Sequence, residues 1–142
     1  MSESVDNIAA IVVDECIRIH RNLGPGLLES VYETVLAGAL KRRGIKIDRQ
    51  VPVDIQYDGL NFAGAFRVDL LISDGLILEI KSVERLTNLH AKQLLTYLRL
   101  TNRSLGLLLN FFRRDHERGH KTRREQSPLL TLRAFAPLRA PE

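Results

Sequence analysis

Residues 66–86, "FRVDLLISDGLILEIKSVERL", decide the fold. They form two short apolar runs joined by the turn "SDG", a pattern that predicts a β-hairpin. Each run carries charge in its middle, Asp69 in the first and Glu79 with Lys81 in the second. Alternate side chains of a strand point to opposite faces, so Glu79 and Lys81 share a face. The hairpin can also bring Asp69 beside Glu79, at about one strand spacing, ~5 Å.

The rest of the chain supplies helices and further strands around this hairpin. Apolar positions at helical spacing predict helices at 5–21, 27–43 and 88–101, and alternating or continuous apolar runs predict strands at 50–57, 61–72, 76–82 and 104–112. The order helix, helix, three strands, helix, strand predicts an α/β sandwich with a mixed sheet. Residues 113–127 are dense in charge and predict a solvated loop or a phosphate-contacting arm, and 129–135 could add an edge strand.

Composition bounds the class of protein. The chain has 142 residues, 44% hydrophobic and 27% charged, which predicts one compact domain with a real core. No apolar run approaches the ~20 residues that a membrane helix needs, and "MSESVDN" lacks the features of a secretory leader, so we expect a cytoplasmic protein that binds no membrane. The single cysteine, Cys16, lies on an apolar helical stripe and is expected to be inert. A net charge of +4 permits a polyanionic partner without demanding one.

The charges of the hairpin allow two interpretations. Two carboxylates that lie close together repel, and a divalent cation is the simplest remedy. Magnesium suits such a site because it takes oxygen ligands, commonly one or two carboxylates with water and substrate phosphate. The alternative is an ordinary amphipathic strand whose polar face meets water. The lysine on the same face as Glu79 favours the metal site, because an ammonium group there can act on a water molecule.

These residues carry a resemblance to a known superfamily. Asp69 followed by "LEIKS" resembles the core of the PD-(D/E)XK nucleases, with Val68 where a proline often precedes the aspartate. The stretch "HRNLGPGLLESVYE" resembles the signature of the GxxExxY protein family within that superfamily, through Gly26, Glu29 and Tyr32. "HAKQLLTYLRLTN" and "GLLLNF" resemble the helix and strand that follow, so the similarity covers roughly residues 20–111.

The resemblance implies a fold and a division of the chain. The expected fold is a restriction-endonuclease-like core (α, three strands, α, strand), here with an extra N-terminal helix. Residues 1–112 would form the nuclease domain, and residues 113–142 a basic arm and C-terminal extension with a candidate edge strand.

The resemblance also implies an activity, the magnesium-dependent hydrolysis of phosphodiesters, with manganese as a substitute. Asp69, Glu79 and the backbone carbonyl of Ile80 would bind the ion, and Lys81 would orient or deprotonate the attacking water. Glu29 matches the helical acidic residue of such nucleases, although it could also be only a helix-start residue. Gln93 could hydrogen-bond a phosphate or the water.

Further residues are candidates for supporting roles. His90, Gln93 and Tyr97 share a helix face, which could equally be a polar flank. His20 could be stabilised by the helix dipole or belong to the site, and Tyr32 could bond a site carboxylate or lie in the core.

The expected partner is nucleic acid, DNA rather than RNA, with a homodimer as one arrangement. Positive charge for its binding comes from Arg99, Arg103, Arg113, Arg114, Arg123 and Arg124. The competing hypothesis is a catalytically silent module of the same fold that binds nucleic acid or protein.

Overall fold

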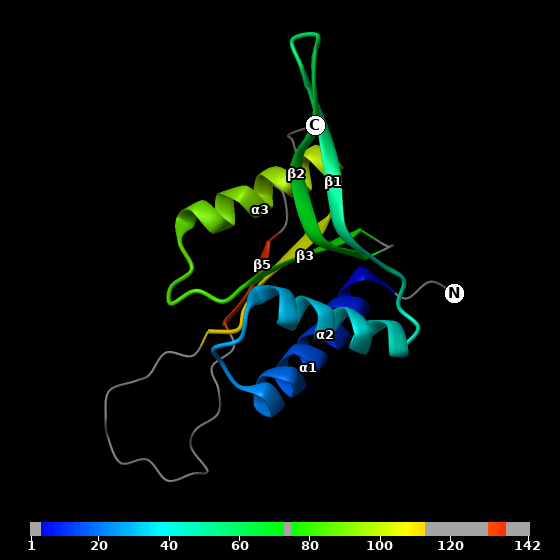
Figure 1. The fold of residues 1–142 in the computed structure, drawn as a ribbon. Helices are drawn as coiled ribbons and strands as arrows, with labels where there is room; N and C mark the ends of the chain where they lie inside the picture. Colours follow the sequence, from blue (N-terminus) through cyan, green and yellow to red (C-terminus); the bar gives the residue numbers. More distant parts are fainter. Residues whose placement is uncertain (1–3, 73–74, 113–130, 136–142) are drawn as a thin grey trace.

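The computed structural model describes residues 4–72, 75–112 and 131–135. Their secondary structure follows the predicted order of helices and strands and adds a fifth strand (Figure 1). The elements are α1 (Val5–Leu23), α2 (Glu29–Arg42), β1 (Ile47–Tyr57), β2 (Leu60–Ile72), β3 (Leu76–Lys81), α3 (Asn88–Thr101), β4 (Leu105–Asn110) and β5 (Thr131–Phe135). The strongly charged residues 113–127, for which the sequence predicts a loop or arm, lie outside the described residues.

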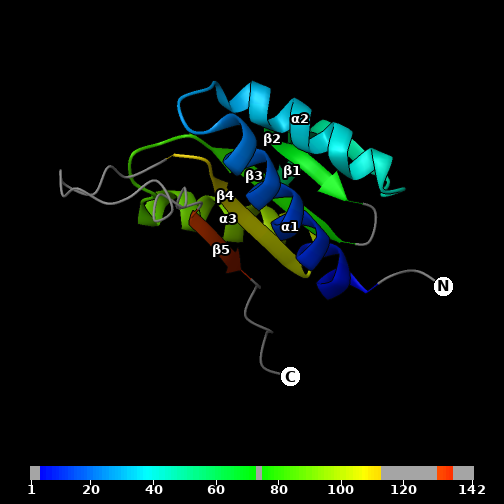
Figure 2. The same ribbon diagram turned by 90° about the horizontal axis from the view of Figure 1, so that it is seen from below.

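The described strands form one mixed sheet in the order β1-β2-β3-β4-β5 (Figure 2). β1, β2 and β3 are antiparallel neighbours, as the hairpin patterns predict. β3 and β4 are parallel, and α3 provides the crossover that a parallel pair requires. β5 pairs antiparallel with β4 and lies within the stretch 129–135 that suggested an edge strand.

Helices cover the sheet from both sides. α1 and α2 lie on one side and α3 on the other, while the far part of the β1–β2 hairpin projects beyond the helices (Figure 1). The larger core, under α1 and α2, includes Leu70, Leu78 and Ile80, and the smaller core, under α3, includes Val68 and Ile77. Cys16 is fully buried in the larger core, and burial raises the pKa of its thiol, as its position on the apolar stripe suggested.

The interpretation of β3 as a strand with a water-exposed polar face is wrong. Residues 76–80 of this strand are all buried, because β3 is a central strand with a helix layer on each side. Polar and apolar residues alternate in the same way whether the polar side chains face water or a second layer of helices. Glu79 therefore carries its carboxyl group under a helix rather than into bulk solvent.

Regular strand pairing is interrupted at Asp69. Leu70 and Ile72 of β2 belong to the core under α1 and α2, but Phe66 and Val68 contact the core under α3. Residues an even number apart share a face on a regular strand, so β2 changes face between Val68 and Leu70. The neighbouring β1 does the same at Gln50, whose φ is +50°. Asp69 therefore lies where the sheet is locally remodelled.

Among the described residues, no helix is both long enough and apolar enough to cross a membrane.

Candidate active site

Asp69 and Glu79 meet where the ladder between β2 and β3 ends. The last regular pair is Leu70 with Leu78, and at the next position side chains replace the backbone bonds. The Asp69 amide donates to Glu79 Oε1 at 3.3 Å, and the Ile80 amide donates to Asp69 Oδ2 at 2.9 Å. The two carboxylates are thus brought side by side at the end of the strand pair, as the hairpin pattern predicts.

Burial and like charge dominate the electrostatics of this carboxylate pair. Glu79 is only 7% exposed, and burial, with the negative charge of Asp69, raises its pKa to about 8. The Asp69 amide and the Lys81 ammonium act in the opposite direction without cancelling this effect. Lys81 forms no ion pair with Glu79, although both residues are described. Within residues 4–72 and 75–112, Glu79 therefore has no ion-pair partner, and a bound cation would supply one.

The donor set around this pair fits a hard divalent ion. Asp69 Oδ2 and Glu79 Oε1 each accept one amide, which leaves further lone pairs on both carboxylates. The backbone carbonyl of Ile80 belongs to the same strand segment. No group of three or more His, Cys, Asp or Glu side chains suited to a metal occurs in the described ranges, so an ion here would need water or substrate oxygens as well. Magnesium accepts such a set, whereas a structural zinc site would not.

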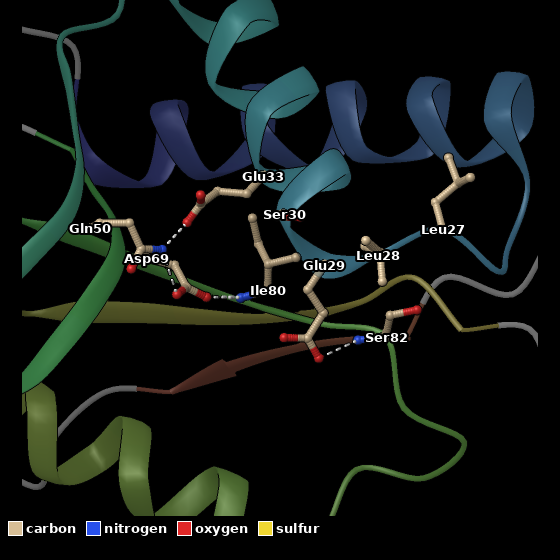
Figure 3. A pocket seen from close by; sticks show the side chains of 9 residues that line it. All are labelled: Leu27, Leu28, Glu29, Ser30, Glu33, Gln50, Asp69, Ile80 and Ser82. Atoms are coloured by element: carbon tan, nitrogen blue, oxygen red, sulfur yellow. Dashed lines mark hydrogen bonds between the residues drawn. The ribbon is translucent and has the colours of Figure 1, made fainter.

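A pocket of about 570 Å³ opens beside Asp69, between α2 and the sheet (Figure 3). It is lined by Leu27, Leu28, Glu29, Ser30, Glu33, Gln50, Asp69, Ile80 and Ser82. Glu79 and Lys81 do not line it. They alternate with Ile80 along β3 and share the parity of Ile77, which packs under α3. Asp69 thus faces the pocket, while Glu79 and Lys81 approach from the side of α3.

The first turn of α2 places Glu29 at this pocket. The Ser82 amide, directly after Lys81, donates to Glu29 Oε1 at 3.1 Å (Figure 3). The preceding turn needs Gly26, whose φ is +97°. The Tyr32 hydroxyl holds that turn, because it donates to the Gly24 carbonyl at 2.5 Å and accepts from the Leu27 amide at 3.2 Å. Gly26 and Tyr32 therefore shape and hold the turn that positions Glu29 at the end of β3.

α3 covers the other side of the carboxylate pair. Tyr97 is half-buried and stacks on Phe66 with ring centroids 4.1 Å apart. Its pKa is raised by burial and by the negative charges of Glu79 and Asp69, which places its phenol near both. Gln93, one turn earlier, is exposed. His90 Nδ1 accepts from the Thr87 amide and so completes the cap of α3.

Other predicted residues lie away from the pair or cannot be placed. His20 is buried and its Nε2 contacts the Phe111 carbonyl at 3.0 Å, and the Tyr32 ring is buried and stacked on Phe111. Arg99 is exposed in the last turn of α3, and Arg103 is half-buried just beyond it. Arg113, Arg114, Arg123 and Arg124 lie outside the described residues.

Some polar residues near the site were not predicted from the sequence. Gln50 donates hydrogen bonds to both Glu33 and Asp69. The side chain of buried Asn110 accepts from the Val83 amide and donates to the Val83 carbonyl. Asn110 could have been found as a polar residue that ends an apolar strand. Gln50 follows the charged residues Asp48 and Arg49 and gives no such signal.

Comparison with known proteins identifies the superfamily and the fold. Residues 6–124 match the family model described as the PD-(D/E)XK nuclease superfamily. The chain belongs to the PD-(D/E)XK nuclease superfamily. A solved structure described as "Crystal structure of SSO0001" superimposes with a TM-score of 0.53 at 20% identity, over 77% of this chain and 50% of the other. The chain thus spans half the length of that structure. At this low identity, the similarity supports the fold alone.

The predicted restriction-endonuclease-like fold is confirmed by the superfamily match and this superposition. No curated protein matches the sequence. Members of the PD-(D/E)XK superfamily act on nucleic acid and generally use divalent metal ions. The activity, the metal and the substrate of this chain are matters for proposal.

Proposed function

We propose that this protein hydrolyses phosphodiester bonds of nucleic acid, DNA in the first place, with Mg²⁺ as its ion and Mn²⁺ as a substitute. The observation that carries the proposal is the convergence of Asp69 and Glu79 at the open end of the β2–β3 ladder, with Lys81 two residues further on and not ion-paired to Glu79. A structural pair of carboxylates would be expected to contact that lysine directly.

The residues divide the work in the following way. Asp69, Glu79 and the Ile80 carbonyl would hold the ion, which when bound supplies Lewis-acid polarisation of a phosphoryl oxygen. Lys81 orients the attacking water and offsets charge that develops on the phosphate. Glu29, anchored by the Ser82 amide, accepts a hydrogen bond from the water on one side of the sheet. Gln93 hydrogen-bonds the water or the phosphate from the other side.

Several finer assignments belong to the same proposal. The turn built by Gly26, Glu29 and Tyr32 supports membership of the GxxExxY family. We further propose residues 1–112 as the nuclease domain and 113–142 as a basic extension whose arginines contact phosphates. A cytoplasmic location and a homodimer that cuts both strands complete the proposal.

A silent binding module of the same fold is the second candidate. The observation that favours it is the burial of Glu79, which is 7% exposed and does not line the pocket. In that case the carboxylate pair would have no ion, and the protein would hold nucleic acid without cleaving it.

Cleavage and binding assays on the same DNA separate the two candidates. Wild type with Mg²⁺ or Mn²⁺ should nick supercoiled plasmid. Lys81→Ala should lose about 10²–10⁴-fold in turnover while it binds the DNA as wild type does, because the lysine acts chiefly in the transition state. Lys41→Ala, which removes an exposed lysine from the last turn of α2, is the matched control and should cleave normally. Equal cleavage by wild type and Lys81→Ala would indicate a contaminating nuclease.

A further inference from the structure

Gln50 adopts a backbone conformation that normally belongs to glycine. Its φ is +50° in the middle of β1, at the position opposite Asp69 where the regular pairing of β1 with β2 skips one residue on each strand. The conformation has a structural use, because it turns β1 from the face of Ile47 to the face of Val51. Glycine would serve that use without strain, whereas a glutamine there costs free energy.

The Gln50 side chain makes hydrogen bonds that a glycine could not make. Its Nε2 donates to Asp69 Oδ1 at 3.2 Å and also to Glu33 Oε1, so one amide group bridges two carboxylates (Figure 3). Glu33 is 6% exposed and is held in turn by Arg49, whose guanidinium lies 3.0 Å from Glu33 Oε2. The order of contacts is therefore Arg49 to Glu33, Glu33 to Gln50, and Gln50 to Asp69.

This series of contacts fixes the orientation of the Asp69 carboxylate. Gln50 holds Oδ1 and the Ile80 amide holds Oδ2, so the group cannot rotate without the loss of a hydrogen bond. The bridging amide also lies between two negative groups, Glu33 and Asp69, that would otherwise repel each other. Outer partners of this kind orient ligands and tune the affinity of metal sites.

We propose that Gln50 is a positioning residue for Asp69 and that Glu33, fixed by Arg49, holds Gln50 in place. The inference rests on the proposed function, since it assigns Asp69 to the ion, and it extends that function to residues outside the nuclease motif. Gln50 does not act on the substrate. Its effect is to keep Asp69 in the orientation in which it can bind the ion.

The test is calorimetric titration of Mn²⁺ into full-length variants. Gln50→Gly keeps the positive φ that β1 needs and removes the bridging amide. Asp58→Gly is the matched control, because Asp58 also has a positive φ, of +51°, and lies at the hairpin tip away from the pocket. We expect Gln50→Gly to weaken Mn²⁺ binding by about 10–100-fold and Asp58→Gly to leave it unchanged. In DNA cleavage, kcat should fall and KM should stay.

Glu33 provides a second pair of variants in case Gln50→Gly does not fold, which melting in a chelator would reveal. Glu33→Ala removes the anchor of Gln50 and should weaken Mn²⁺ binding, while Glu33→Gln keeps an acceptor oxygen for Gln50 and should restore most of it. Wild-type affinity in Gln50→Gly or in Glu33→Ala overturns the inference and leaves the proposed function standing. A wild type that binds no Mn²⁺ overturns both.

Discussion

Replacement of Glu79 by glutamine should stabilise the metal-free protein, by an amount that depends on pH. The pKa of Glu79 is raised from 4.5 to about 8 by burial and by Asp69. Between these two pH values the folded protein keeps a proton that the unfolded chain releases, so the contribution of this group to stability is complete below pH 4.5 and is lost as pH rises to about 8. Glutamine does not titrate, and its carbonyl oxygen can still accept the Asp69 amide.

The size of the effect follows from the same pKa. At pH 7.5 the difference from 4.5 corresponds to about 4 kcal/mol as an upper limit, since each unit is worth ~1.4 kcal/mol. Local rearrangement and water reduce this penalty in real proteins, so we expect about 1–3 kcal/mol, or roughly 3–10 °C in Tm for a chain of this size. Near pH 4.5 the two proteins should melt together.

Thermal melts with a chelator at pH 4.5, 6 and 8 measure this difference. Glu84→Gln, which removes an exposed carboxylate shortly after β3, controls for the change in net charge. Mg²⁺ should then raise the Tm of wild type and leave Glu79→Gln almost unmoved, because an ion that binds only the folded state stabilises by RT ln(1 + [L]/Kd). A Glu79→Gln protein that is less stable than wild type at pH 8, or a difference that does not change with pH, would refute the assignment of a strained carboxylate pair.

Two further predictions concern the ion and the basic segment. Asp69→Asn should also lose the Mg²⁺ response in melting curves, and a full response would remove Asp69 from the site. Its metal-free stability should change by no more than ~1 kcal/mol, because the relief of repulsion is offset when one of the two hydrogen bonds that Asp69 accepts is lost. If residues 113–124 contact phosphates, Arg123→Ala with Arg124→Ala should lower the slope of log affinity against log salt by about two in DNA-binding titrations, near one for each contact, and an unchanged slope would leave the segment without that role.

The sequence predicts the nuclease core well because its signals are local. Period-two alternation locates Asp69, Glu79 and Lys81, and helical periodicity locates α3 to the residue. The burial of Glu79 could not be predicted, since a strand shows the same alternation of polar and apolar residues whether its polar face meets water or a second helix layer. β1 also begins at Ile47, earlier than predicted, because Asp48 and Arg49 resemble a loop in sequence although they lie on an edge strand.

The link from Gln50 to Asp69 shows why the remaining part of the site escapes sequence reasoning. It depends on a positive φ at a residue type that rarely adopts one, and on a side chain that meets partners 17 and 19 positions away. Neither property leaves a pattern in the neighbouring residues. A regular sheet at this point would pair the Asp69 amide with backbone and would not need the Glu79 carboxylate as its acceptor. The interruption of the sheet is therefore what turns two strand carboxylates toward each other, and the glutamine that accommodates the interruption is the residue best placed to orient one of them.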